Sequence, residues 1–209
     1  MALYQRLTPV DLSAVAVAHH NLGYCFLVES RFPEAQREFE TALDLWRSAG
    51  SPEQRDQFHC LTNLASALAL QEKLSEALPH AEAAMEMFAR LGSQDHSDVA
   101  LFLSHMAMWL KRAGRVAEAP ARLEASVRME QRLTPGDSEQ ITLRLFNLGA
   151  CLHQLGRDPE ARPVAEEADA MAKRLLPEGD ALRTKCAGLL RLVGDAANTS
   201  KPDQQPAKQ

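Results

Sequence analysis

The sequence has few aromatic residues and no dominant charge. Of its 209 residues, 5% are Phe, Trp or Tyr, whereas 45% are hydrophobic in total. A core filled mainly with Ala and Leu favours helices over sheets. The net charge of −5, from 23 basic and 28 acidic residues, gives no sign of the clustered Lys and Arg that a nucleic-acid backbone selects. The composition therefore predicts a helical protein whose partners do not include nucleic acid.

Long apolar runs and the common chemical motifs are also missing. No stretch approaches the roughly 20 apolar residues that a membrane span requires, and no basic segment followed by an apolar run opens the chain. No glycine-rich phosphate loop, HExxH string or combination of nucleophile, base and oxyanion donor occurs. We therefore expect a cytoplasmic protein that is not an enzyme, needs no cofactor and does not associate with membranes.

The four cysteines form no CxxC pair. Each falls in an expected helix among apolar neighbours, at Cys25, Cys60, Cys151 and Cys186. A chain of this length can build a core without disulfides, and a zinc site requires closer pairs with histidine at ligand spacing. Small buried thiols are therefore the expected role of all four.

One cassette is written four times at a fixed step of 42 residues. Two of its positions recur as Leu22, Leu64, Met106, Leu148 and as Ala35, Ala77, Ala119, Ala161. A fixed period of this length is typical of a solenoid, in which each unit buries its apolar face against its neighbours. Any functional site should therefore lie on a surface that several repeats build together.

Each copy contains two amphipathic helical patterns. In the fourth copy, apolar residues recur every three or four positions from Ile141 to Leu152, Gly156 ends this helix, and a second stripe runs from Ala161 to Met171. A further column of small residues comprises Gly23, Ala65, Ala107 and Gly149. Small side chains let two helix backbones approach closely, so this column and the Ala35 column predict the contact between the two helices of each hairpin.

The repeated strings NLGYCFLVESRFPEA, NLASALALQEKLSEA, HMAMWLKRAGRVAEA and NLGACLHQLGRDPEA resemble the tetratricopeptide repeat. The usual unit has about 34 residues, and a 42-residue unit is similar to the kinesin-light-chain type. The resemblance implies an all-α, right-handed superhelical solenoid of antiparallel helix pairs, with four hairpins and a C-terminal capping helix. Its motif is structural, so it brings no catalytic residue.

We expect repeats at about 10–50, 52–92, 94–134 and 136–177, a capping helix at 179–194 and a disordered tail at 195–209. The tetrapeptide from Arg6 to Pro9 recurs from Arg132 to Pro135, three periods later, where a second helix ends. Residues 1–9 are therefore expected to be either the end of a preceding second helix, in a longer array, or a natural N-terminal cap. In the first case, the exposed stub would allow self-association.

The resemblance places the binding groove on the first helix of each repeat. The candidate peptide-binding residues carried over to this sequence are His20, Asn21, Tyr24, His59, Asn63, Ser66, His105, Met108, Lys111, Arg112, Phe146, Asn147 and His153. Leu101, Ser104 and Leu143 occupy further groove positions. A carboxylate clamp is not expected, because the lysine that such domains hold before the Asn column is missing.

One groove column carries Asn21, Asn63, His105 and Asn147. A carboxamide offers a donor and an acceptor, so it can bind the backbone of an extended peptide without selecting its side chains. The same chemistry would let these residues bridge neighbouring helices instead.

Other candidates also have two explanations. Lys111 and Arg112 form a basic spot for an acidic ligand side chain, or simply a solvated helix end, and Phe146 lines a pocket or packs in the core. The histidines are not expected to bind a metal, because successive helices lie about 10 Å apart.

Two functions follow as hypotheses. The first is a protein–protein interaction module that binds an extended peptide or partner segment on its concave face. The alternative is the sensor or regulatory region of a larger signalling protein, acting on a STAND ATPase or a caspase-like protease.

Overall fold

The computed structural model describes residues 11–92 and 94–199. The chain divides into two compact units, residues 1–93 and 94–209. Within the described residues all regular structure is helical, as the sequence predicts. The expected N-terminal stub, residues 1–9, lies outside the described residues, as do residues 200–209 of the expected tail.

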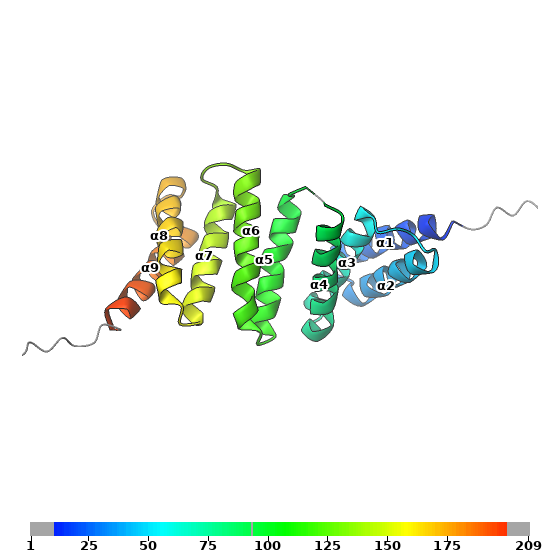
Figure 1. The fold of residues 1–209 in the computed structure, drawn as a ribbon, viewed down its shortest axis with the longest axis horizontal. Coiled ribbons are helices and arrows are strands. Elements are labelled where there is room, and N and C mark those ends of the chain that lie inside the picture. The colour runs from blue at the N-terminus through cyan, green and yellow to red at the C-terminus, as the bar shows by residue number, and fades with distance from the viewer. Residues whose placement is uncertain (1–10, 93, 200–209) are drawn as a thin grey trace, which may run out of the picture. The chain divides into compact units, whose positions relative to one another are not determined.

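Unit one contains two antiparallel helix pairs (Figure 1). They are α1 (Leu12–Val28) with α2 (Phe32–Ser48), and α3 (Arg55–Leu70) with α4 (Leu74–Arg90). Consecutive helices pack on one another, and α1 also contacts α3. The first helices of the two repeats are therefore neighbours, which is the arrangement that a groove lined by first helices requires.

Unit two contains two more pairs and a closing helix (Figure 1). They are α5 (Ser97–Arg112), the 3₁₀ turn η1 (Val116–Glu118) with α6 (Ala119–Leu133), α7 (Glu139–Gln154), α8 (Asp158–Leu175) and α9 (Ala181–Thr199). Helix α9 packs on both α8 and α7 and exposes Lys185 and Arg191. It runs to Thr199, past the expected end at residue 194, because Ala196 and Ala197 continue a good helix-forming sequence.

The turn between the two helices of each repeat passes through one left-handed residue. At the equivalent positions Ser30, Glu72, Gly114 and Gly156, φ is 60°, 64°, 80° and 70°. Glycine adopts this conformation without a steric penalty, whereas Ser30 and Glu72 adopt it at some cost. The predicted end of the first helix at Gly156 is confirmed.

The small-residue columns lie where the paired helices cross. Ala35 and its three copies are fully buried. A Cβ atom placed on Gly23 would lie 2.7 Å from Cε1 of Phe39, so α1 and α2 approach too closely there for any side chain. The predicted contact between the helices of a hairpin is therefore confirmed for α1 and α2.

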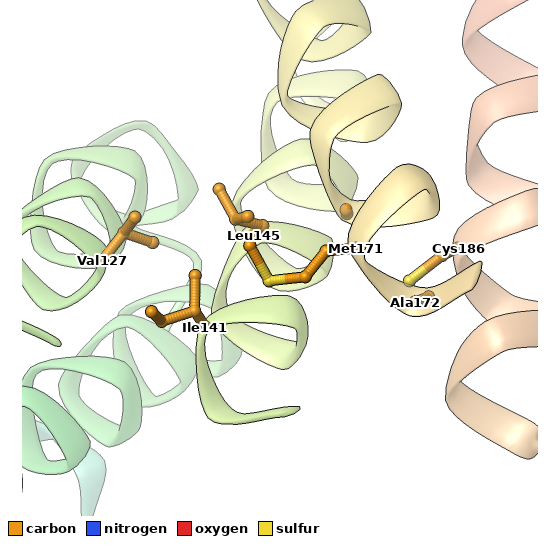
Figure 2. Packing of buried hydrophobic residues seen from close by; sticks show 7 residues of the cluster. Val127, Ile141, Leu145, Met171, Ala172 and Cys186 are labelled. Carbon is orange, nitrogen blue, oxygen red and sulfur yellow. The ribbon is translucent and has the colours of Figure 1, made fainter. Parts of the chain in front are cut away.

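A hydrophobic cluster joins the last helices of unit two. Figure 2 shows Val127 of α6 and Ile141 and Leu145 of α7 beside Met171 of α8, with Cys186 of α9 at the far side. Because this cluster takes residues from four helices, the packing of unit two continues from α6 through to the closing helix.

An ion pair recurs in three repeats between the end of the second helix and the loop before the first. The pairs are Arg90 with Glu53, Arg132 with Asp95, and Arg174 with Asp137. In each, the guanidinium donates through both Nε and Nη2 to the two carboxylate oxygens. Such bidentate geometry fixes the loop relative to the helix end.

One face of α1 differs from its copies. Leu22 is 44% exposed, whereas Leu64, Met106 and Leu148 are buried, and Cys25 is exposed although a buried thiol was expected. In α3 the equivalent face contacts α2, where the thiol of Cys60 donates to the carbonyl of Phe39. Among the described residues, only the N-cap Asp11 precedes α1. The other three cysteines are buried and free, and burial raises the pKa of Cys60 to about 12.

Candidate functional site

A pocket of about 260 Å³ lies in unit two, between the first helices of its two repeats. Its lining comprises Leu101, Ser104, His105, Ala107, Met108 and Lys111 of α5, Leu123 of α6, and Leu143, Arg144 and Asn147 of α7. A volume of this size holds one large side chain rather than a whole small-molecule ligand. The pocket therefore suits a side chain of a segment that lies across α5 and α7.

Seven of these ten lining residues occupy groove positions that the resemblance carried over. They include the candidate site residues His105, Met108, Lys111 and Asn147, which the structure brings together. Leu101, Met108 and Leu143 are large apolar side chains that remain about half exposed, at 47%, 53% and 47%. Exposed apolar residues around a concave site mark a surface that a partner can cover.

The polar groups of the pocket differ in charge. Burial lowers the pKa of His105, and the nearby Arg144 lowers it further, so His105 is neutral at neutral pH. Its ring lies beside Trp109, with 6.4 Å between the ring centroids. Lys111 is half-buried and Asn147 is half-buried. The lining thus combines two cationic side chains, Lys111 and Arg144, with neutral donors and acceptors, and contains no acidic residue.

Arg144 belongs to a buried polar cluster at the base of the pocket. Its Nε donates to Oγ of Ser126 at 2.9 Å, and Nη2 lies 3.2 Å from Oε2 of Glu130. Ser126 in turn donates to the carbonyl of Ala100 and shares a hydrogen bond of 2.8 Å with Ser104. The cluster therefore ties α5, α6 and α7 together beneath the pocket.

This cluster was not predicted from the sequence. Arg144, Ser126 and Glu130 lie in columns whose other members are apolar, so the signal was a departure from the repeat rather than a motif. Ser126 and Glu130 lie on α6, and Arg144 lies on α7. The helical period alone does not specify that these positions of the two helices face each other.

In unit one, two candidate site residues contact each other. Nδ2 of Asn63 on α3 lies 3.4 Å from Nε2 of His20 on α1, within a long hydrogen bond between two first helices. At this position the structure has the bridging arrangement that the sequence left open. His20 also packs near Phe39 and Trp46, and burial lowers its pKa.

The remaining candidates of unit one lie on the same helices. Asn21 and Tyr24 are exposed on α1, and Tyr24 is 53% exposed. His59 and Ser66 are half-buried on α3, where Oγ of Ser66 donates to the carbonyl of Thr62 at 2.8 Å. These side chains offer a mixed surface with no excess of either charge.

Three candidates of unit two lie outside the pocket lining. Arg112 is exposed at the end of α5. Nδ1 of His153 lies 2.5 Å from Oδ1 of Asp158, so this imidazole is held by the start of α8. Phe146 packs against the hydrophobic cluster of Figure 2, which is the core role that the sequence left open for it.

Within residues 11–92 and 94–199, no group of three or more His, Cys, Asp or Glu side chains is placed to hold a metal ion. Over the same residues, no helix is both long enough and apolar enough to cross a membrane.

The helix pairs and their repeated turns define a helical-repeat protein. The family model of the tetratricopeptide repeat matches residues 14–90, which span almost all of α1–α4. Residues 14–90 are therefore tetratricopeptide repeats, as their motifs indicated. No curated protein sequence matches it.

Three solved structures show the same fold at low sequence identity. A Podosopora anserina protein assigned as a kinesin light chain, with nearly identical TPR-like repeats, has a TM-score of 0.71 and 17% identity over 90% of this chain and 89% of that one. BtubC (BKLC) of P. vanneervenii has a TM-score of 0.64 and 18% identity over 96% and 88%. YrrB, a TPR protein with an unusual peptide-binding site, has a TM-score of 0.56 and 16% identity over 88% of both chains.

Proposed function

We propose that this protein is a non-enzymatic interaction module that binds an extended peptide or partner segment across α5 and α7. The observation that carries the proposal is the pocket between these helices, which is lined by groove positions and bordered by the exposed Leu101, Met108 and Leu143. Large apolar side chains around a pocket for one side chain provide the anchor chemistry of many protein interfaces.

The polar lining suits a peptide backbone. Asn147 can donate to a carbonyl and accept from an amide of an extended segment, and the neutral His105 can do the same through its two ring nitrogens. YrrB, which shares the fold, has a peptide-binding site of its own and supports the general function.

The same proposal places the protein in the cytoplasm, with a protein partner rather than nucleic acid or lipid. A regulatory role within a larger signalling protein uses the same groove, because a partner segment that covers α5 and α7 could be presented by an effector domain. Self-association would instead use the expected N-terminal stub, residues 1–9.

The proposal is tested by selecting binders from a random library of 12-residue peptides displayed on phage, with the full chain as the target. A selected peptide is then synthesised and titrated by fluorescence anisotropy. We expect Asn147→Ala to weaken binding about two- to tenfold, the value of one neutral hydrogen bond. Asn63→Ala should change affinity less, because Asn63 of the wild type contacts His20.

The matched control is Gln131→Ala, which removes an exposed carboxamide from the second helix α6. It should leave both folding and binding unchanged. Failure of the library to yield any binder, or equal affinities for Asn147→Ala and the wild type, would contradict a peptide-binding function at this groove.

A further inference from the structure

The polar cluster beneath the pocket replaces core residues at three repeat positions together. The position of Arg144 holds Ala18, Cys60, Phe102 and Cys186 in the other copies. The position of Ser126 holds Ala42, Ala84 and Ala168, and that of Glu130 holds Trp46, Phe88 and Ala172. Arg144 contacts both Ser126 and Glu130, and the equivalents of all three in the other repeats are apolar or Cys, so this polar set is specific to the interface of α6 and α7.

The cluster is only partly satisfied. Arg144 and Glu130 are 6% and 5% exposed, and they are the buried ion pair at the base of the pocket. Oε2 of Glu130 faces the guanidinium but accepts no hydrogen bond of good geometry. Burying an ion pair in place of well-packed apolar residues is often neutral or unfavourable for stability. Departures from a local rule of this kind are expected where a function requires them.

Among the residues that line the pocket and Glu130 beneath it, cations outnumber anions by one. The cations Lys111 and Arg144 line the pocket, and Glu130 pairs with Arg144 at its base. Burial lowers the pKa of His105, which favours its neutral form. The apolar walls, Leu123 and Met108 among them, reduce competition from water, which strengthens any ion pair formed there. One carboxylate would balance the site, and the volume of about 260 Å³ has room for the side chain that carries it.

We infer that this pocket selects an acidic side chain of the bound segment. The aliphatic part of the Asp or Glu packs between Met108 and Leu123, and its carboxylate accepts hydrogen bonds from Arg144 and Lys111. This inference rests on the proposed function and adds the chemistry that the groove recognises. It assigns to Arg144 a direct contact with the ligand, with Ser126 and Glu130 holding the guanidinium in place.

The test uses peptides selected from the random library on the full chain. Wild type should enrich peptides with an Asp or Glu at one fixed position, and replacing that residue by Asn or Gln should weaken binding tenfold or more, because hydrogen bonds between charged groups are the strong ones. Amidating the C-terminus of the same peptide should change affinity less than twofold, which separates a side-chain carboxylate from a terminal one.

A single change of Arg144 risks unfolding, so the decisive variant transfers the apolar set found between α2 and α3. Ser126→Ala, Glu130→Trp and Arg144→Cys together reproduce Ala42, Trp46 and Cys60, all of which are buried. The folded triple variant should bind the acidic peptide and its amide counterpart with affinities within twofold of each other.

The outcomes separate this inference from the general function. Binders without a fixed acidic residue, or a triple variant that still prefers the acid by tenfold, overturn the inference and leave peptide binding in place. An effect of C-terminal amidation in place of the side-chain effect also overturns it. A library that yields no binder contradicts the proposed function, and the inference falls with it.

Discussion

The interface between α2 and α3 joins repeats one and two, and the one between α6 and α7 joins repeats three and four. The two occupy equivalent places but have opposite chemistry. The first has Ala42, Trp46 and Cys60, all fully or nearly fully buried. The second has Ser126, Glu130 and Arg144 at the same positions, equally buried and joined by polar contacts. Both interfaces hold a second helix against the next first helix. The repeat therefore does not require the polar set, and in unit two the pocket lies directly above that set.

The largest expected effect follows from breaking the polar set in part. Arg144→Met leaves Glu130 buried without its cation, and removing one partner of a buried ion pair typically costs about 3–5 kcal/mol. Because the pocket admits water on one side, we expect a loss near the lower end, about 3 kcal/mol. Urea unfolding followed by circular dichroism measures it.

Replacing the whole set should have a much smaller effect. The triple change to Ala, Trp and Cys removes both charges together, and such replacements are often neutral or stabilising. Equal losses of unfolding free energy in Arg144→Met and in the triple variant would show that the interface depends on the polar contacts themselves, contrary to the comparison with α2 and α3.

A second comparison concerns the small column in the two units. A Cβ on Gly23 would lie 2.7 Å and 2.8 Å from the ring of Phe39, which is fully buried and cannot move aside. Overpacking of this kind should cost unit one about 1–3 kcal/mol of unfolding free energy. The better helix propensity of Ala should recover about 1 kcal/mol of that loss in Gly23→Ala.

The matched change in unit two is Gly149→Ala. Its nearest obstacle is Cδ2 of Leu189, at 3.0 Å, which is the end of a flexible side chain. The propensity gain should here offset the contact, so stability should change by less than about 1 kcal/mol. Thermal unfolding of both variants measures the difference. A larger loss for Gly149→Ala than for Gly23→Ala would contradict the view that Phe39 sets the closer helix approach.

Much of the fold could be predicted because it is periodic. The 42-residue step and the helical stripes indicated paired helices, and the small columns indicated where they cross, since each depends on local spacing. The groove positions could be predicted for the same reason. Met108 and Asn147 line one pocket because they occupy equivalent faces of helices that pack in the same way in each repeat.

The rest depends on contacts that spacing does not determine. The partners of Arg90, Arg132 and Arg174 lie 37 residues earlier in the chain, across a whole hairpin. The hydrogen bond of Asn63 to His20 depends on the side chain that the neighbouring helix happens to carry. The exposure of Cys25 follows from its place on the first described helix, although its local sequence resembles that of the buried Cys151.

The smallest effect concerns the recurring ion pairs outside the core. Arg132 holds the pKa of Asp95 below its usual value, chiefly through the hydrogen bonds to its carboxylate. A carboxyl whose pKa is lower in the folded state contributes stability above its ordinary pKa and loses it as the pH falls through the folded value. Arg132→Gln should therefore lower the melting temperature at pH 6, and the difference from wild type should shrink as the pH falls below the ordinary carboxyl pKa of about 4.

Arg128→Gln is the control for that change. It removes the same charge from α6, where Arg128 pairs with Glu124 within one helix at 3.4 Å. Exposed pairs along a helix contribute little, so this variant should melt close to wild type at pH 6. Raising the salt concentration at pH 6 should shrink the difference between Arg132→Gln and wild type, because both groups are open to solvent. If Arg128→Gln shows the same loss and the same pH dependence, net charge rather than the pairing of loop and helix end accounts for the effect.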